Sequence, residues 1–485
     1  MSESPQNPRA VPRQAMLEGN ITSVLLRLAW PTVLTSALQG LAVTVDVVMV
    51  GRLGEASVAA VTAARQVLMV VLVAGGAVAA STGILVAQAM GRGARDEADH
   101  IATQSLVVFC GVVLLILTPI GWYVTPWLLR GLTEGDAKVL AIGVPYMRIV
   151  VLVMAPTLIS FSAMGALRGA GDTRTPLNLT ILTNVVHIVA NYALIFGVPR
   201  LHIPAFGVLG AAYASAISRA VPLALLFWWM ARGALVLRFE RRLCFDGRLL
   251  TRMLRLGTPH ATSSVLLNLW GLLVIKILYQ TDMARAAVAA YGLSMMMRNF
   301  GTWVTWGFAE ATMAMVGQNI GAGNRARAAK IGWAATRIAA VYLFPVAMLI
   351  GLTAPWTLSL MLREPDALHK AQVVAIGTVF LQTQILALPL LGMGMSLEGA
   401  LRGTGDTLSP LLINLGSLYA FGLPLSLLLA VHAVPLGAVT LPGAGWGATG
   451  VWWGMAIGVM VRGLWGWLRW MAWQRRHVET VDGAR

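Results

Sequence analysis

Asp46 is the one acidic residue in an apolar stretch that runs from Val24 to Val50. A helix of this length crosses a bilayer at about 1.5 Å per residue. A carboxylate at membrane depth is costly, by about 2.5–3.5 kcal/mol at a helix centre, and by default marks an ion or substrate site. Asp46 is therefore the first candidate for cation binding. The alternative is an interfacial side chain that caps the next turn or pairs with Arg52.

Three further polar residues lie within a later apolar stretch, 176–198. Asn184, His187 and Asn191 are spaced at i, i+3 and i+7, which places them on one face of a helix. Amide and carboxylate oxygens are hard ligands that suit Na⁺, whereas a histidine titrates near neutral pH. The alternative is that His187 and Asn191 are helix-packing groups with satisfied hydrogen bonds.

The composition indicates whether these elements fold in water or in a membrane. The chain has 485 residues, of which 57% are hydrophobic and only 12% are charged. A soluble protein would carry about 25% charged residues, so this is an integral membrane protein. The two cysteines, Cys110 and Cys244, lie in unrelated surroundings and suggest no disulfide.

The net charge of +16 could suggest a nucleic-acid partner, but its placement argues otherwise. Most lysines and arginines fall in tails and loops on the side of the N-terminus. This bias is the positive-inside signal. It predicts an inner (cytoplasmic) membrane protein with both termini in the cytoplasm and no nucleic-acid partner.

Twelve apolar spans position the candidate residues. We predict them at 24–50, 58–86, 101–127, 137–165, 176–198, 206–231, 258–280, 288–316, 330–356, 371–398, 409–432 and 446–471. The predicted organisation is a tail (1–23), an N-terminal lobe (24–231), a basic linker (232–256), a C-terminal lobe (257–471) and a second tail (472–485).

The two halves repeat each other. ALRGAGDT at 166–173 returns as ALRGTGDT at 400–407, and AQAMGRG at 87–93 is echoed by GQNIGAG at 317–323. Six spans per half return the chain to its starting side, so the halves are parallel repeats. The predicted fold is all-α, with twelve transmembrane helices in two parallel six-helix lobes. This is the plan of a transporter that alternates access, and it requires no second copy, so we expect a monomer in the lipid bilayer.

The repeated LRGxGDT motif predicts a tight structural turn. Its glycines can end one helix in a left-handed cap, and Thr175-Pro176 or Ser409-Pro410 can begin the next. Two local ion pairs are expected at the membrane surface, and their members are Arg168 with Asp172 and Arg402 with Asp406.

These turns, Trp30-Pro31, Asp46 followed by Gly51, VGQNIGAGN at 316–324 and LIFG at 194–197 resemble the multidrug and toxic compound extrusion (MATE) family. The resemblance covers roughly residues 24–470. It implies an antiporter that exports organic, often cationic or amphipathic, compounds in exchange for Na⁺ or H⁺.

The resemblance also implies a cation site in the N-terminal half. The acid of the first helix falls on Asp46, and the threonine of the sixth helix falls on Ser215. The fifth-helix pattern N-x-x-N-x-x-x-D keeps Asn184, replaces an asparagine by His187, and has Asn191 where many members have aspartate. With one carboxylate fewer and a titratable histidine, the site favours protons over transient Na⁺.

The C-terminal half offers a less conventional set. Lys276, Glu310 and Glu398 are charged residues at membrane depth, and we hypothesise that an acid holds the amine. The alternative is that Lys276 reaches the outer surface. Near-end arginines, Arg298 and Arg462 among them, are expected to reach the interface likewise. Three residues are candidates for a substrate cavity wall, namely Trp303, Trp306 and Met313.

Other function classes find little support. The seven histidines form no HxxxH or HExxH pair, and no P-loop, GxGxxG, GxSxG or CxxC motif is present. We therefore expect neither an enzyme nor a cofactor or resident metal, only a coupling ion. The nearest rival function is a flippase for a lipid-linked precursor of the same superfamily. An intramembrane enzyme is more distant.

Overall fold

The computed structural model describes residues 10–53, 55–132, 136–238, 240, 245–362, 365–436 and 439–479. Parts of the two predicted tails and of the basic linker (239 and 241–244) lie outside these residues, as does Cys244. The described chain forms two compact units. Unit 1 comprises Met1–Gly19 and Trp30–Ala261, and unit 2 comprises Asn20–Ala29 and Thr262–Arg485.

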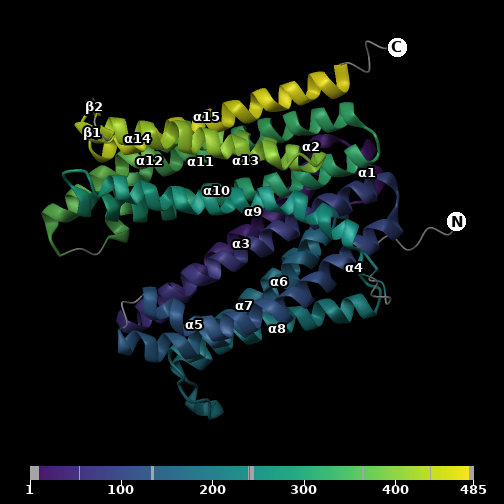
Figure 1. Cartoon of the computed structure of the whole chain (residues 1–485), viewed down its shortest axis with the longest axis horizontal. Helices are drawn as coiled ribbons and strands as arrows, with labels where there is room; N and C mark the ends of the chain where they lie inside the picture. Colours follow the sequence, from purple (N-terminus) through teal and green to yellow (C-terminus); the bar gives the residue numbers. More distant parts are fainter. Residues whose placement is uncertain are drawn as a thin grey trace. The chain divides into compact units, whose positions relative to one another are not determined.

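Unit 1 is built from helices around a central α6 (Figure 1). Its helices are α1 (Arg13–Glu18), α3 (Glu55–Arg92), α4 (Arg95–Val112), α5 (Thr118–Leu132), α6 (Ala137–Gly169), α7 (Arg174–Phe196) and α8 (Val208–Ala231). A π-helical turn, Val113–Leu117, joins α4 to α5. α6 packs against α3, α4, α5 and α8, and α7 packs against α8.

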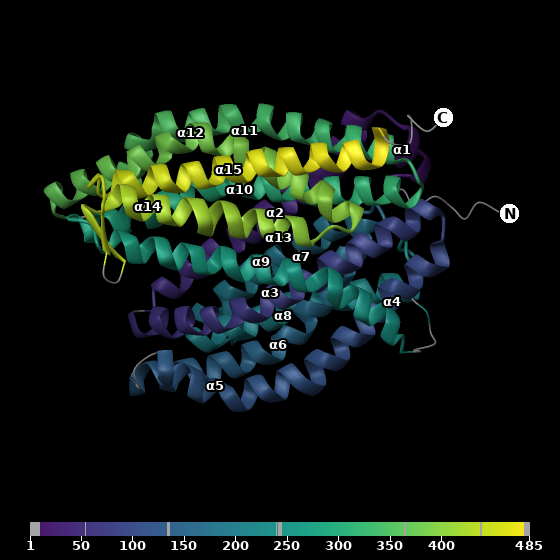
Figure 2. The same ribbon diagram turned by 45° about the horizontal axis from the view of Figure 1, so that its top comes forward.

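Unit 2, whose helices are also seen in Figure 2, repeats this plan, because α12 packs against α10, α11 and α15. Its helices are α10 (Ala284–Gly321), α11 (Arg325–Met361), α12 (Ala367–Thr404), α13 (Leu408–Asn414), α14 (Leu423–Ala430) and α15 (Ala448–Gln474). A π-helical segment, Leu415–Gly422, joins α13 to α14, and a β-hairpin joins α14 to α15. The hairpin pairs β1 (Ala433–Leu436) with β2 (Val439–Pro442), a feature that the hydropathy pattern did not predict.

Two long helices are divided between the units. α2 (Ile21–Gly51) changes unit after Ala29, and α9 (Gly247–Leu278) changes unit after Ala261. The predicted linker therefore differs from the structure, because its second half is already helical from Gly247. Its first half lies on α4, where the backbone N–H of Arg238 donates to Asp99 Oδ1 at 2.8 Å. Burial raises the pKa of the Asp99 carboxyl, and this hydrogen bond opposes the effect.

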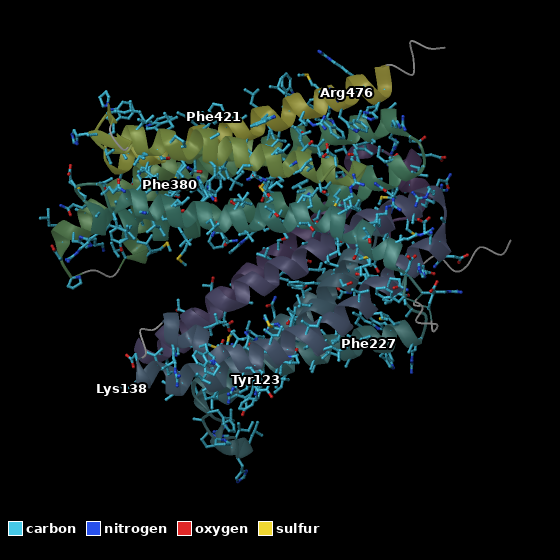
Figure 3. All side chains as sticks on the ribbon, in the orientation of Figure 1. Tyr123, Lys138, Phe227, Phe380, Phe421 and Arg476 are labelled. Carbon is cyan, nitrogen blue, oxygen red and sulfur yellow. The ribbon has the colours of Figure 1, made fainter. Side chains whose placement is uncertain are left out.

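The described helices match the twelve predicted spans, each with a helix or with consecutive helices. Among them, eight are long and apolar enough to cross a membrane by composition alone. Large apolar side chains also cover the outer surfaces of the units, such as Tyr123 (75% exposed) and Phe421 (54%), whereas Phe380 is buried (Figure 3). An apolar exterior of this kind requires lipid, so the all-α, membrane-embedded fold is confirmed.

Close helix contacts show that the sequence repeat is also a structural repeat. In unit 1, Gly165 of α6 lies so close to the carbonyl oxygen of Ala79 in α3 that no Cβ would fit. In unit 2, Gly399 of α12 meets the carbonyl oxygen of Ala309 in α10 in the same way. Small residues allow such approaches in membrane bundles. The same pair of helices thus packs by the same device in each half.

The LRGxGDT turns are nearly identical in geometry. Gly171 and Gly405 end their helices with φ of +89° and +93°, where the lack of a Cβ is needed. Helices α7 and α13 begin earlier than predicted, and an aspartate caps each of them. Asp172 Oδ1 accepts from the N–H of Thr175, and Asp406 Oδ1 accepts from that of Ser409, both at 2.9 Å.

The expected pair of Arg402 with Asp406 is not formed. Asp406 instead accepts from Arg469 of α15 at 2.8 Å, and Arg402 lies 3.7 Å from Glu310. The aspartate points along the start of α13 to serve as its cap, which turns it away from Arg402. In the first LRGxGDT motif, Asp172 likewise caps the following helix, α7, and Arg168 lies in the last turn of the preceding helix, α6.

Candidate functional site

The carboxylate of Asp46 points into unit 1, towards α7. Its Oδ1 atom lies 2.7 Å from His187 Nε2 and accepts a 2.7 Å hydrogen bond from Asn191 Nδ2. The Asp46 side chain is 24% exposed and that of His187 only 7%. The position of Asp46 therefore fits the first interpretation, a site that faces the protein interior, better than the alternative of an interfacial side chain.

The predicted polar face of α7 is buried along its length. Asn184, His187 and Asn191 are 8%, 6% and 0% exposed, so the i, i+3, i+7 spacing located the correct face. Asn191 Nδ2 also lies 3.1 Å from His187 Nε2. Asn184 Nδ2 donates to the backbone oxygen of Leu38 in α2 at 3.2 Å, a bond that joins α7 to α2. Asn184 lines the same cavity as Asp46.

A serine that the sequence analysis missed completes the network. Ser218 Oγ lies 3.1 Å from His187 Nδ1 and 3.1 Å from the backbone oxygen of Ser215. Ser215, the predicted residue, lines the same cavity and supplies that backbone oxygen. Ser218 follows Ser215 by three residues on one face of α8, and this spacing was the signal available in the sequence.

The cluster borders a cavity of about 330 Å³ inside unit 1. Polar side chains gather on one side, among them Asp46, His187, Ser218 and Arg219. The rest of the wall is mainly apolar, with residues such as Val153, Met154, Leu158, Phe161, Met164 and Pro222. A cavity of this size and lining suits a small amphipathic molecule.

Two charged side chains and one hydrogen-bond acceptor without a donor shape the electrostatic potential in the cavity. The carboxylate of Asp46 acts on the half-buried guanidinium of Arg219, which tempers the negative potential. Asn191 Oδ1 is buried and has no hydrogen-bond partner among the described residues. A buried carbonyl oxygen without a donor is costly, so this atom is available to a water, a proton donor or a cation.

The polar residues of unit 2 form a different pattern from the one hypothesised. Glu398 of α12 binds Arg462 of α15 through two hydrogen bonds, of 2.7 and 2.8 Å, and both side chains are buried. Lys276 is exposed in the last turn of α9. The described part of the chain records no ion pair between Lys276 and Glu398 or Glu310, so the structure favours the alternative in which this lysine reaches the surface.

Of the three candidates for a substrate wall in unit 2, Met313 is buried, whereas Trp303 and Trp306 are partly exposed. Met313 is 1% exposed inside α10, next to Gly403 of α12. Trp306 is partly buried against an apolar cluster that includes Leu388. Trp303 makes an edge-to-face contact with Phe300 at 5.1 Å. Met313 is thus a core residue. Gly403 of α12 allows α10 and α12 to approach each other closely at this position.

Comparisons with known proteins agree with this architecture. The MatE family model matches residues 31–193 and 259–428. A probable multidrug resistance protein NorM of Deinococcus radiodurans is 30% identical over 91% of this chain and 93% of its own length. A NorM of Thermotoga maritima is 27% identical over 95% of each chain.

Solved structures show the same fold. The outward-facing conformation of a MATE transporter of the MOP superfamily superimposes with a TM-score of 0.85 at 22% identity, over 96% of this chain and 99% of the other. A MATE structure in the straight conformation gives the same TM-score and identity.

The MatE family match and the multidrug-resistance relatives identify this chain as a multi-pass membrane transporter, and not an enzyme. This chain belongs to the MatE family, whose members are the multidrug and toxic compound extrusion transporters, and its twelve transmembrane helices form the two lobes of that family.

Proposed function

We propose that this protein is a secondary active antiporter of the inner membrane, with both termini in the cytoplasm. It exports organic, cationic or amphipathic compounds in exchange for H⁺ by alternating access. The observation that carries this proposal is the buried contact of Asp46 with His187 and Asn191 beside an amphipathic cavity. The names of the NorM relatives, which are multidrug resistance proteins, support the same class of cargo.

The contact between Asp46 and His187 holds a proton. An oxygen and a ring nitrogen at 2.7 Å form a hydrogen bond only if one of them carries a hydrogen. Either Nε2–H donates to the carboxylate, or a protonated carboxyl donates to Nε2. Deprotonation of both atoms would set two lone pairs against each other, so the pair keeps at least one proton.

Ser218 provides a place for a second proton. When His187 is neutral with Nε2–H towards Asp46, the Ser218 hydroxyl donates to Nδ1. When His187 is protonated on both nitrogens, Nδ1–H donates to Ser218 Oγ, whose own hydrogen turns to the backbone oxygen of Ser215. Rotation of the Ser218 hydroxyl therefore keeps His187 Nδ1 hydrogen-bonded in both protonation states.

The same contacts argue for H⁺ over Na⁺. Na⁺ prefers oxygen ligands, but Asp46 Oδ1 is faced by two nitrogens, those of His187 and Asn191. The orphaned Asn191 Oδ1 is the oxygen that Na⁺ would use instead. A direct comparison of the two ion gradients decides between these cases.

Exchange follows if the proton and the cargo favour opposite lobe arrangements. A cationic compound in the cavity competes with the proton for the single carboxylate, Asp46. A ligand shifts a conformational equilibrium only by its differential affinity for the two states. Proton binding from outside then promotes release of the compound, and proton loss to the cytoplasm resets the transporter.

The size and lining of the cavity favour small compounds over the rival cargo. A volume of about 330 Å³ suits a drug-sized molecule, not a lipid-linked precursor with its long chain. The transporter acts as a monomer in the lipid bilayer, because one chain supplies the cavity and the coupling site, and it has no nucleic-acid partner.

The decisive experiment uses everted vesicles and a fluorescent organic cation, under an imposed ΔpH or an imposed ΔNa⁺. Wild type is compared with Asp46→Asn and with Asp282→Asn, an exposed control acid. We expect ΔpH to drive exchange in wild type and in the control but not in Asp46→Asn at equal abundance. Normal exchange in Asp46→Asn would refute the proposal, and exchange driven only by ΔNa⁺ would refute the choice of proton.

A further inference from the structure

Arginines lie in the interior of both units, whereas the sequence predicted them at the membrane interface. In unit 2, Arg298 and Arg462 are only 9% and 6% exposed, and Arg462 belongs to a buried ion pair. In unit 1, the half-buried Arg219 of α8 lines the cavity that Asp46 and His187 border. Arg219 therefore brings a positive charge to the space in which we propose that cargo binds.

The charge of Arg219 is permanent and is not held in a local pair. An arginine cannot lose its proton in a protein. Within the described part of the chain, its guanidinium makes no hydrogen bond or ion pair, and the titratable groups that act on it are Asp46 and Tyr146, which line the same cavity. The positive charge therefore contributes to the potential inside the cavity.

The charges of the lining do not add up to a net negative charge in either protonation state. Asp46, His187 and Arg219 are the lining residues that can carry a charge near neutral pH. With one proton, the pair of Asp46 and His187 has one negative charge, which Arg219 cancels. With a second proton, the pair is neutral, and Arg219 leaves the cavity with one net positive charge.

A fixed positive charge discriminates between compounds by their own charge. The electrostatic energy is proportional to the product of the two charges, so Arg219 opposes a dication twice as strongly as a monocation and leaves a neutral compound unaffected. The apolar side of the wall, with residues such as Val153 and Phe161, weakens the screening of this repulsion by water. Asp46 can compensate one positive charge, and the described lining holds no second acid for another.

We propose that Arg219 is a specificity-determining residue, which restricts the cargo of this transporter to compounds with no more than one positive charge. Its guanidinium selects by repulsion and needs no contact with the compound. Sites commonly gain specificity by such a repulsive element, which acts against the wrong ligand. The inference rests on the proposed function in that the compounds that bind in the cavity are those that are exported.

The test uses three bipyridines of nearly the same shape, namely the neutral parent, its singly N-methylated monocation and its doubly N-methylated dication. Equilibrium binding of each to the purified full-length protein is measured by calorimetry, without an ion gradient. Wild type is compared with Arg219→Met, Arg219→Gln and Arg219→Lys. The matched control is Arg232→Met, because Arg232 at the end of α8 is exposed and lies over the ring of Trp228, away from the cavity lining.

We expect Arg219→Met and Arg219→Gln to bind the dication at least about tenfold more tightly than wild type, and the monocation about threefold more tightly, because the gain in free energy doubles with the charge. The affinity for the neutral parent should change by less than about twofold. Arg219→Lys keeps the charge and should retain the wild-type order of affinities, as should Arg232→Met. In vesicles, Arg219→Met should export the dication faster than wild type does.

Two results would overturn the proposal. One is unchanged binding of all three compounds in both uncharged variants, which would make the guanidinium irrelevant to cargo. The other is an equal change for the three compounds, which would show that Arg219 shapes the cavity and not its potential. Two uncharged variants are used, so that misfolding of one leaves the other to decide. Binding is measured without an ion gradient, so failure of proton-driven exchange would count against the proposed function and not against this role of Arg219.

Discussion

The Nε2 atom of His187 lies 2.7 Å from Oδ1 of Asp46, although the two residues are 141 positions apart in the chain. α7 supplies the ring and α2 the carboxylate, so the proton shared by this pair also joins two helices of unit 1. Any change in its protonation alters the contact between those helices. The antiport that we propose requires a link of this kind between ion binding and conformational change.

Replacement of His187 by asparagine should change the coupling ion. The variant removes the titratable ring and a charge-assisted hydrogen bond worth about 1.5–3 kcal/mol, while it adds an amide oxygen beside Asp46. We expect ΔpH-driven exchange to fall at least about tenfold and a response to Na⁺ to appear. Exchange of a fluorescent cation in vesicles under each gradient measures both.

His202→Asn provides the matched control for this substitution. His202 is exposed between α7 and α8, and its φ of 55° lies in the left-handed region that asparagine adopts readily. The control should behave as wild type. Unchanged ΔpH-driven exchange in His187→Asn would remove the histidine from the coupling mechanism.

Ser218→Ala should slow ΔpH-driven exchange without abolishing it. The alanine deletes the group that accepts from Nδ1–H of the protonated ring and donates to Nδ1 of the neutral ring. Hydrogen bonds to charged groups are about twice as strong as neutral ones, so the protonated state loses more. We expect the rate of exchange at a fixed ΔpH to fall about threefold to tenfold, since about 1.4 kcal/mol corresponds to tenfold.

Ser215→Ala separates this effect from a general loss of polarity in α8. Ser215 enters the network through its backbone oxygen, which an alanine retains. Its rate of exchange should stay within about twofold of wild type. A loss of the same size in both variants would indicate that cavity polarity, and not the hydroxyl of Ser218, sets the rate.

The sequence was sufficient for those features that depend on periodicity. Apolar spans predicted the helices, and the buried face of α7 followed from the spacing of Asn184, His187 and Asn191. The repeated LRGxGDT motif predicted a helix end with a left-handed glycine, which Gly171 and Gly405 provide. Each of these features is encoded within a few consecutive turns of chain.

Features that depend on how helices pack were not predictable in this way. Ser218 contacts His187 only because α7 lies against α8. Glu398 meets Arg462 across 64 residues, and neither spacing nor composition favours this partner over Lys276. Asp406 turns from Arg402 to the start of α13 and to Arg469, a choice that requires the position of α15.

The cap and the ion pair of Asp406 can be separated by mutation. Asp406→Ala removes the cap of α13, worth about 0.5–2 kcal/mol, and also the contact with Arg469. Arg469→Met leaves the cap in place. It removes the partly exposed contact with Asp406 (32% and 23%), worth about 1 kcal/mol or less, and the hydrogen bond from Arg469 Nε to Ser409 Oγ. Thermal unfolding in detergent should rank Asp406→Ala as the less stable variant. Equal losses would mean that the aspartate does not act as a cap.

The buried pair of Glu398 and Arg462 should show strong coupling between its members. Both side chains are less than 10% exposed and share two hydrogen bonds. Loss of one partner leaves an uncompensated charge, which costs about 3–5 kcal/mol, whereas replacement of both by apolar residues is often neutral or stabilising. Glu398→Gln and Arg462→Met should therefore each melt well below wild type, and the double variant Glu398→Leu/Arg462→Met should recover most of the loss. Additive losses in the double variant would show that the two groups are stabilised by other contacts, and the paired geometry would then have no energetic role.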